Sequence, residues 1–369
     1  MKLAEDIDVD TKPLVSIIIN NYNYERYLSE AIDSAIAQTY PHTEVIVVDD
    51  GSSDKSREII ASYGDRITPV LKENGGQASA FNSGLATSKG EIIIYLDSDD
   101  VLLPNIVKRV VEAFQAHPEV IKVQYQLRVV DGETKDLGKI MPDSRFMPNG
   151  NLKHHIRKFH TYGCPPTSGN AFASKELKKI FPVPEKQYRI AADEYVNNLV
   201  PILGPILSLT EVGGLYRVHG NNNYCKPAEG LEEPARLRKV MLQNAESRNW
   251  QRQLYNSVYS TNLKDIGSWE LGFLKYRVSS LKQDPINHPF PDNLLSLCVR
   301  GCISCFISPY MRFRGRLLFI FWFIGMLFIP SKIAKSFTEK LLYPEERKQW
   351  IKGIFASIRK FGKQTTIIE

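Results

Sequence analysis

The 369-residue chain lacks both of the common glycine-rich phosphate loops. The turn after its first predicted strand, at 20–24, contains no glycine, so it does not fit the G-x-G-x-x-G fingerprint of dinucleotide-binding proteins. No G-x-x-x-x-G-K-[ST] sequence occurs anywhere in the chain. These absences argue against a Rossmann dehydrogenase and against a P-loop enzyme. A nucleotide bound by this chain would be held by carboxylates and amides, with its phosphates reached through a metal ion.

Cysteines are few, and the N-terminus has no apolar core. Five cysteines without a pairing pattern indicate a reducing compartment. Cys298, Cys302 and Cys305 fall on one helical face with no histidine nearby, which favours buried small apolar side chains over a metal site. Residues 1–8 are acidic, so we expect no secretory signal and a protein that faces the cytosol.

The first hundred residues alternate between apolar strands and helical segments. Apolar, β-branched runs predict strands at 14–19, 44–48, 67–71 and 91–96. Helical spacing of apolar residues predicts helices at 27–38, 55–63 and 77–87. This alternation predicts an α/β fold with a mostly parallel sheet flanked by helices. The carboxyl ends of such strands lie along one edge, where ligands bind.

Three carboxylates follow the most apolar of these strands. The run 91–96 ends at Asp97, Ser98, Asp99 and Asp100. Like charges this close repel one another unless a divalent cation offsets the repulsion, and hard oxygen ligands suit Mg²⁺ or Mn²⁺. The alternative is a solvated acidic turn that caps the next helix. A second acidic strand end, at 49–54, favours the metal site.

Seven segments between residues 13 and 223 match a known family in order and spacing. They are V-S-I-I-I with N-Y (15–19, 23–24), V-V-D-D-G-S-S-D (47–54), N-G-G-Q with N-S-G (74–77, 82–84), L-D-S-D-D (96–100), S-G-N-A-F (168–172), A-D-E-Y (192–195) and Y-R-V-H-G-N-N (216–222). Together they resemble the inverting glycosyltransferases of family 2. The resemblance implies a glycosyltransferase A fold, with a Rossmann-like sheet, over residues 13–225.

The resemblance also implies a binding site for a nucleoside diphosphate sugar. Asp50, beside Asp49, would hold the base, and a carboxylate there can accept the imide N–H of uracil or thymine, which favours a UDP or dTDP sugar. The turn at 74–77 opens a helix whose free N–H groups would favour phosphate or ribose oxygens, although such a turn is otherwise common. The predicted nucleotide-sugar contacts are Asn20, Tyr22, Asp49, Asp50, Asn74, Gly76, Gln77, Asn82, Asp97, Ser98 and Arg217.

By the same resemblance, Asp97 and Asp99 bind the ribose and a metal ion that bridges the diphosphate. Asp100 is either a third contact or an acid that orients the others. The metal would act as a Lewis acid on the departing nucleoside diphosphate. His219 is the third predicted metal ligand, with a structural role as its alternative. Arg217 alternates onto the same side and could reach the diphosphate.

The acceptor hydroxyl needs a general base, for which a carboxylate is suited. Asp193 and Glu194 occupy the position of the family's Glu-Asp pair in reversed order. The aligned register makes Glu194 the base, which we favour slightly, whereas the roles swap if the geometry requires the aspartate. Asp193 could also simply cap its helix. The acceptor side is predicted to be lined by Thr167, Ser168, Gly169 and Asn170.

The chain changes character after residue 225. We expect a flexible N-terminus at 1–12, a catalytic domain at 13–225, a helical packing region at 226–290 that opens with a linker at 226–230, and membrane-associating helices at 291–369. The apolar blocks within the last region are 294–307 and 317–329. The second block has 13 residues, about 20 Å as a helix against a bilayer core of ~30 Å, so it is short for a membrane span.

Positive charge is concentrated in the last sixty residues. Residues 310–369 hold twelve Lys and Arg against four Glu, a net charge of +8, whereas the whole chain carries +6. Basic residues next to apolar helices, including 351–361, predict peripheral or monotopic attachment to the cytoplasmic face of an anionic membrane. A buried helical hairpin or a dimer interface is the alternative. Nucleic acid is disfavoured, because the basic residues accompany apolar runs and no nucleic-acid motif is present.

The sequence therefore predicts a membrane-associated, metal-dependent inverting glycosyltransferase. It would move a sugar from a nucleoside diphosphate donor to a hydroxyl of a glycan or lipid-linked glycan in polysaccharide biosynthesis at the cell envelope, using Mn²⁺ or Mg²⁺. The sequence leaves a homo-oligomer open. A nucleotidyltransferase is disfavoured, because no G-x-G-x-R loop follows the first strand. The alternative from another class is a non-catalytic nucleotide-sugar-binding scaffold, supported only by the reversed order of Asp193 and Glu194.

Overall fold

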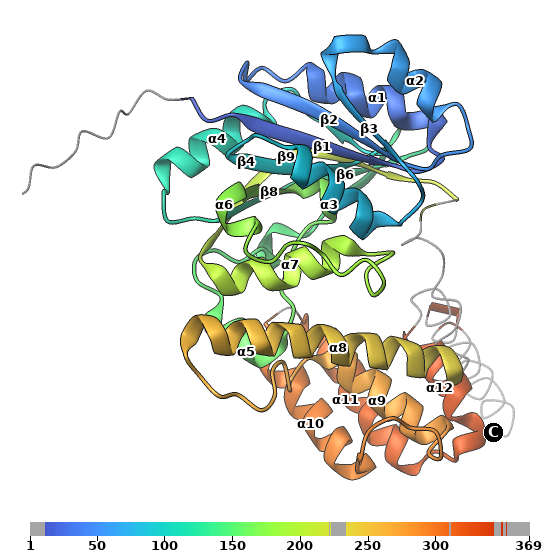
Figure 1. Ribbon diagram of the computed structural model, residues 1–369. Coiled ribbons are helices and arrows are strands. Elements are labelled where there is room, and N and C mark those ends of the chain that lie inside the picture. Colours follow the sequence, from blue (N-terminus) through green and yellow to red (C-terminus); the bar gives the residue numbers. More distant parts are fainter. Residues whose placement is uncertain are drawn as a thin grey trace, which may run out of the picture. The chain divides into compact units, whose positions relative to one another are not determined.

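The computed structural model describes residues 12–220, 222, 234–309, 311–342, 348–349 and 352. The chain divides into two compact units. The first contains the described residues up to 222 together with Gln251–Lys264, and the second contains 234–250 and the described residues from Asp265 onward (Figure 1). The N-terminal residues 1–11, the predicted linker at 226–230 and all but one residue of the predicted helix at 351–361 lie outside the described residues.

The first unit is built on a nine-stranded sheet with the order β3-β2-β1-β4-β8-β6-β9-β5, and β7 pairs with β6. Its strands are β1 (Val15–Asn21), β2 (Thr43–Asp50), β3 (Thr68–Lys72), β4 (Ile92–Asp97), β5 (Val101–Leu102), β6 (Lys122–Asp131), β7 (Asp136–Met141), β8 (Asn170–Ala173) and β9 (Ile206–Val218). The strands β1 to β4 are mutually parallel, and β8 joins them antiparallel. The predicted α/β fold with a mostly parallel N-terminal sheet is confirmed.

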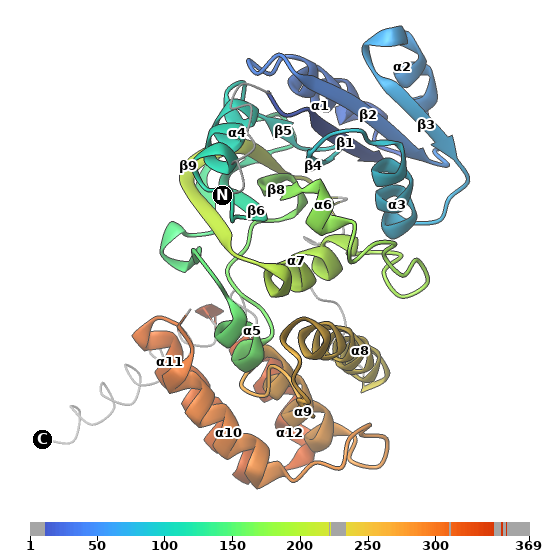
Figure 2. The same cartoon turned by 60° about the vertical axis from the view of Figure 1, so that its left-hand side comes forward.

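Helices cover both faces of this sheet. They are α1 (Glu25–Ile36), α2 (Ser56–Ser62), α3 (Gln77–Thr87), α4 (Ile106–Ala116), α5 (Lys153–Phe159), α6 (Ser174–Leu177) and α7 (Ala192–Leu203). Because side chains alternate along a strand, Ile17 and Ile19 pack with α1, whereas Ile18 meets α3 on the opposite face. A Cβ added to Gly84 of α3 would lie 2.3 Å from Ile18, so this close packing requires glycine. Figures 1 and 2 show α1 and α3 on opposite sides of the sheet.

The parallel register brings the polar strand ends together. Asn20 lies opposite both Val48 and Asp97, and Asn21 lies opposite Asp49. Later in the chain, β9 pairs with β5, directly after the carboxylates of the β4 turn. The end of β9 therefore returns Arg217, His219 and Asn222 to that turn.

The second unit is helical. Its helices are the first part of α8 (Pro234–Tyr259), α9 (Leu271–Gln283), α10 (Leu294–Ile307), α11 (Phe313–Phe328) and α12 (Ser331–Leu342). The end of α8 belongs to the first unit, where Gln251 Nε2 donates hydrogen bonds to the Asn198 and His160 carbonyls.

The apolar blocks at 294–307 and 317–329 form α10 and most of α11. Trp322 and Phe323 pack with Cys298 and Cys305 in one core, so the prediction of buried, unpaired cysteines is confirmed for these two. None of the helices in the described part of the chain combines the length and the hydropathy that a membrane-spanning helix needs.

Candidate active site

Asp100 is the anchor of the β4 turn. Its carboxylate accepts hydrogen bonds from the Ser168 hydroxyl (2.6 Å) and from the Arg217 backbone N–H (3.0 Å). The Ser168 hydroxyl also accepts one from the Asp97 backbone N–H (3.1 Å). Only 1% of Asp100 is exposed. Of the two roles considered for Asp100, the structure favours the acid that orients the turn.

Asp97 and Asp99 are the carboxylates that remain for a ligand. Asp99 Oδ2 lies 3.0 Å from His219 Nε2 and accepts a hydrogen bond from Asn222 Nδ2 (3.0 Å). Asp97 Oδ1 accepts one from Asn20 Nδ2 (3.2 Å), whereas Asn20 Oδ1 is buried without a hydrogen-bond partner. The structure brings the predicted nucleotide contact Asn20 next to Asp97, and the predicted metal ligand His219 next to Asp99.

The electrostatics of this cluster favour a bound cation. Burial, together with the charges of Asp99 and Asp193, raises the pKa of Asp97 to about 7. Burial also raises the pKa of Asp99, against the opposing effect of His219, and that of Asp100 well above its usual range. Each carboxylate therefore lacks the stabilisation that it would have in water, which a cation would supply.

The side chains present fit a hard divalent cation. Asp97 and Asp99 offer carboxylate oxygens, and the unpartnered Asn20 Oδ1 lies next to Asp97. Within the described ranges, no group of three or more His, Cys, Asp or Glu side chains is arranged to hold a metal by itself. Mg²⁺-type sites commonly use one or two carboxylates together with substrate phosphates, so a complete set of protein ligands is not required.

Arg217 does not have the predicted role. Its guanidinium donates hydrogen bonds to the Asp99 carbonyl (2.8 Å) and the Thr134 hydroxyl (2.7 Å), pairs with Glu30, and lies over the Tyr27 ring at 4.8 Å. Because it is 2% exposed and these partners occupy it, Arg217 holds the β4 turn instead of reaching a diphosphate.

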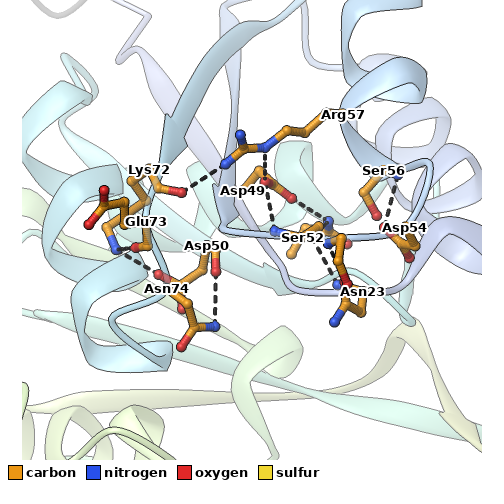
Figure 3. A network of polar contacts seen from close by, with 12 residues as sticks. Asn23, Asp49, Asp50, Ser52, Asp54, Ser56, Arg57, Lys72, Glu73 and Asn74 are labelled. Atoms are coloured by element: carbon orange, nitrogen blue, oxygen red, sulfur yellow. Dashed lines mark hydrogen bonds and ion pairs between the residues drawn. The ribbon is translucent and has the colours of Figure 1, made fainter.

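A second pair of aspartates lies at the end of β2 (Figure 3). Asp49 is fully buried and accepts hydrogen bonds from Arg57 Nε (2.8 Å), Asn21 Nδ2 (3.0 Å) and the Ser52 N–H (3.1 Å). Burial alone would raise the pKa of Asp49, but these hydrogen bonds hold it below its usual value. Asp49 is therefore a structural anion under the predicted base site.

Asp50 lies at the predicted base site and is already highly coordinated. Its carboxylate accepts from Lys72 Nζ (2.6 Å), the Gly75 N–H (2.9 Å) and the Gly76 N–H (2.6 Å). Next to it is a pocket of about 480 Å³ lined by Gly51, Ser52, Arg57, Leu71, Lys72, Glu73 and Asn74. Since an ionised carboxylate has about four acceptor positions, Asp50 keeps one for a ligand.

The turn at 74–77 differs from its prediction as a phosphate or ribose cradle. The Gly75 and Gly76 amides point at Asp50, and the Gln77 N–H donates to the Arg189 carbonyl (2.8 Å). A Cβ on Gly76 would lie 2.4 Å from Arg189, so glycine lets the segment before α7 close over the turn. These amides already donate to protein acceptors, so they are not free for a phosphate. The acceptors come from distant parts of the chain and follow only from the tertiary structure.

Gln77, Asn82 and Asn74 also hold this segment. Gln77 Oε1 accepts a hydrogen bond from the Ala192 N–H (2.8 Å). Asn82 Oδ1 accepts one from the Val183 N–H (2.7 Å), and Asn82 Nδ2 donates one to the Val183 carbonyl (2.9 Å). Asn74 Oδ1 accepts from Arg189. The predicted ligand contact of Asn82 is therefore replaced by a positioning role.

Asp193, not Glu194, lies near the β4 carboxylates. The charge of Asp193 raises the pKa of Asp97, and the Thr167 side chain hydrogen-bonds both residues. Burial raises the pKa of Asp193 itself, whereas the Lys122 charge lowers it. Glu194 is exposed on the first turn of α7. The two members of the reversed pair therefore have different surroundings.

The predicted acceptor segment has mixed roles. Thr167 is 4% exposed and lies between two carboxylates, so it remains a candidate for the reaction centre. Ser168 ties the β4 turn, and Asn170 Nδ2 donates to the Pro166 carbonyl (2.7 Å) within its own turn. A Cβ on Gly169 would lie 2.5 Å from Pro165. Ser168, Gly169 and Asn170 thus shape the loop.

Comparisons with known proteins agree with this geometry. The sequence model of glycosyl transferase family 2 matches residues 16–177. An uncharacterised glycosyltransferase of Nostoc sp. strain PCC 7120 is 38% identical over 223 residues, which cover 59% of this chain and 69% of the relative. The chain belongs to glycosyltransferase family 2. The resemblance seen in the sequence is confirmed.

Two further comparisons are a sequence relative that aligns over a shorter stretch and a solved structure that shows the fold alone. An uncharacterised glycosyltransferase of Rickettsia typhi is 43% identical over 137 residues, 36% of this chain and 42% of that protein's length. The crystal structure of S. aureus TarS 1–349 in complex with UDP-GlcNAc aligns with a TM-score of 0.52 and 16% identity, covering 89% of this chain and 91% of that one. This likeness confirms the predicted fold class.

The sequence analysis of this glycosyltransferase missed several residues at the site. Tyr24 and Tyr27 pack on the His219 ring, with centroids 5.6 and 4.9 Å away. Partial burial and the charges of the three β4 carboxylates raise the pKa of Tyr24. Lys122 is fully buried, donates to Tyr162 Oη (2.6 Å) and Asn197 Oδ1 (2.8 Å), and has a pKa lowered by burial to about 8. Lys122 opens β6, which also contains Gln124, Gln126 and Arg128, so its sequence did not mark this lysine as buried.

Proposed function

We propose that this glycosyltransferase transfers a sugar from a nucleoside diphosphate donor to an acceptor hydroxyl with inversion at the anomeric carbon. The observation that carries the proposal is a second buried carboxyl, Asp193, close enough to Asp97 for its charge to raise the pKa of Asp97, with Thr167 a neighbour of both. One carboxylate site serves the leaving diphosphate, and the second serves the attacking hydroxyl. Direct displacement needs these two functions on opposite sides of the transferred sugar.

Asp193 is the proposed general base. It accepts the proton of the acceptor hydroxyl while the hydroxyl oxygen bonds to the anomeric carbon and the bond from that carbon to the diphosphate oxygen breaks. A pKa raised by burial brings a carboxyl closer to the working pH of a base, and Asp193 has such a shift. Glu194, which the sequence analysis favoured as the base, is exposed and is therefore the less suited of the two residues.

Asp97 and Asp99 are proposed to hold a Mn²⁺ or Mg²⁺ ion, with His219 beside Asp99. When bound, such an ion supplies Lewis-acid stabilisation of the nucleoside diphosphate. The protein residues orient this site: Ser168 and Arg217 hold Asp100, and Asn222 and His219 hold the Asp99 carboxylate. The pKa of Asp97 near 7 implies that protons compete with the metal ion.

The donor is proposed to be a UDP or dTDP sugar. Asp50 retains an acceptor position suited to the imide N–H of uracil or thymine, next to the pocket beside Arg57 and Lys72. TarS, which has the same fold, was crystallised with UDP and with UDP-GlcNAc, and this supports the choice. The exposed ring of Tyr22 is a candidate contact for the base or ribose.

The acceptor is proposed to be a hydroxyl of a glycan or lipid-linked glycan, and the place of action the cytoplasmic face of a membrane. The contrasting function is a scaffold that binds the donor without catalysis. A panel of nucleoside diphosphates and their sugars, tested with and without Mn²⁺, separates the two. Metal-dependent UDP or dTDP binding with donor hydrolysis or transfer supports the enzyme. Binding with no turnover of any donor, with acceptor glycans present, would establish the scaffold.

A further inference from the structure

We propose that the outward faces of α10 and α11 form a docking surface for an anionic lipid leaflet. It rests on the membrane location proposed above and identifies the surface that would attach the protein there. The proposal rests on three features of the second unit: exposed apolar side chains, the absence of acidic residues between positions 293 and 338, and the length of the helices.

Each helix buries one face and exposes another that is also apolar. The buried face contributes to the core around Trp322 and Phe323. The exposed side chains, between 42% and 65% accessible, are Val299, Ile303 and Phe306 on α10 and Leu317, Phe321 and Ile324 on α11. Within each helix they recur every three or four residues, so they share one face. Exposed apolar side chains gathered on one face of a helix mark an interaction site.

The two helices lie side by side in one hairpin. A Cβ on Gly301 of α10 would lie 2.3 Å from the Phe323 ring of α11, so the helices are in close contact (Figure 2). Arg316 closes the hairpin by donating to the Ser308 (2.8 Å) and Cys305 (3.1 Å) carbonyls at the end of α10. The apolar stripes are therefore parts of one rigid element.

The charge pattern of this element matches an anionic partner. From residue 293 to 338 there is no Asp or Glu, while Arg and Lys occur six times. Arg312 and Arg314 are exposed at the start of α11, and Lys332 and Lys335 are exposed on α12 just after it. Exposed apolar side chains bordered by basic residues are typical of helices that lie in the headgroup region of a membrane.

A second copy of the chain fits this surface less well. In a two-fold dimer the same patch meets itself, so the basic residues of both copies would face each other without acidic partners. A membrane span is also disfavoured, because α11 has 16 residues, or roughly 24 Å, against a bilayer core of ~30 Å. Attachment parallel to the membrane plane fits both the short length of α11 and the basic residues beside it.

The test is sedimentation of the full-length protein with vesicles. Vesicles of phosphatidylcholine alone are compared with vesicles that also contain phosphatidylglycerol. The variant L317E/F321E places charge on the exposed face of α11, and R312Q/R314Q removes two basic residues. The matched control L137E/I140E changes two apolar side chains of similar exposure (45% each) on the β7 hairpin of the first unit. Nucleoside diphosphate binding and thermal melting report whether each variant folds.

We expect the wild-type protein and L137E/I140E to bind the anionic vesicles equally. L317E/F321E should lose at least tenfold in partitioning, and R312Q/R314Q should lose about fivefold per basic residue on anionic vesicles only. Absence of vesicle binding by the folded wild-type protein would overturn the proposal. So would concentration-dependent dimerisation that L317E/F321E abolishes, because the face would then serve a second copy. Neither result depends on which sugar is transferred.

Discussion

Aspartates end both β2 and β4, the two strands that flank β1 in the sheet, and the surroundings of the two aspartate pairs differ. At the end of β2, Asp49 pairs with Arg57 and Asp50 with Lys72. At the end of β4, no Lys or Arg side chain in the described part of the chain forms an ion pair with Asp97 or Asp99. The first pair is neutralised by the protein itself. The second pair has no such partner, so burial raises the pKa values of Asp97 and Asp99. Our proposal assigns this place to a cation that binds with the substrate.

The largest expected effect comes from removing the carboxylate across the site from Asp97. Asp193→Asn keeps the size of the side chain but cannot accept a proton. Transfer should fall by about 10²–10⁴-fold, while nucleoside diphosphate binding persists. Glu194→Gln is the matched control and should change the rate far less. Equal losses in both variants, or a larger loss in Glu194→Gln, would contradict Asp193 as the base and favour Glu194, the residue that the family alignment indicates.

Asp99→Asn removes one of the two carboxylates at the end of β4 that we propose as metal ligands. Nucleoside diphosphate binding in the presence of Mn²⁺ should weaken by roughly tenfold or more, because one anionic ligand is lost. Binding without metal should change little. Isothermal titration with and without Mn²⁺ measures both values, and Asp65→Asn, an exposed aspartate in another part of the unit, is the control. Metal-dependent binding that survives Asp99→Asn would remove Asp99 from the metal site.

Lys72→Met tests the neutralised site. The Lys72 ammonium contacts the nearly buried Asp50 carboxylate at 2.6 Å, so its removal should lower the free energy of unfolding by about 1–3 kcal/mol. Two backbone N–H groups still bind Asp50, which limits the loss. Denaturant unfolding measures the change. Arg26→Met, which removes an exposed ion pair with Glu133, should cost ~0–1 kcal/mol, and a similar cost for both variants would contradict this account.

The smallest expected effect is a shift in pH dependence. The Lys122 charge lowers the pKa of Asp193, so Lys122→Met should raise that pKa further. Because a base works only when deprotonated, the acidic limb of the pH profile of kcat/KM should move to higher pH, with activity recovered at alkaline pH. Lys89→Met, at an exposed lysine, should leave the profile in place. An unchanged profile in Lys122→Met would show that Lys122 acts only in packing.

Much of the site could be predicted because it depends on local patterns. The apolar runs before Asp49 and Asp97 predict strands that end together, since parallel strands share one ligand edge. The family segments added His219 to Asp97 and Asp99, and the structure brings His219 to within 3.0 Å of Asp99 through β9. These residues lie at strand ends whose position follows from periodicity.

The misplaced residues are those whose partners come from distant segments. Arg217 was expected at the diphosphate, but Glu30, Thr134 and the Asp99 carbonyl occupy it. The amides of the turn at 74–77 were expected to be free, but Asp50 and Arg189 use them. A donor group looks available in a sequence until the fold places an acceptor beside it.

The sequence by itself determined the family, the order of strands and helices, and the presence of acidic strand ends, because hydrophobic periodicity and short motifs are local properties. Only the tertiary structure decided which aspartates are paired with cations and which are not, and that Asp193 rather than Glu194 stands near Asp97. It also decided which apolar side chains of α10 and α11 enter the core and which stay exposed. The physical reason is that burial and charge pairing depend on neighbours far apart in the chain.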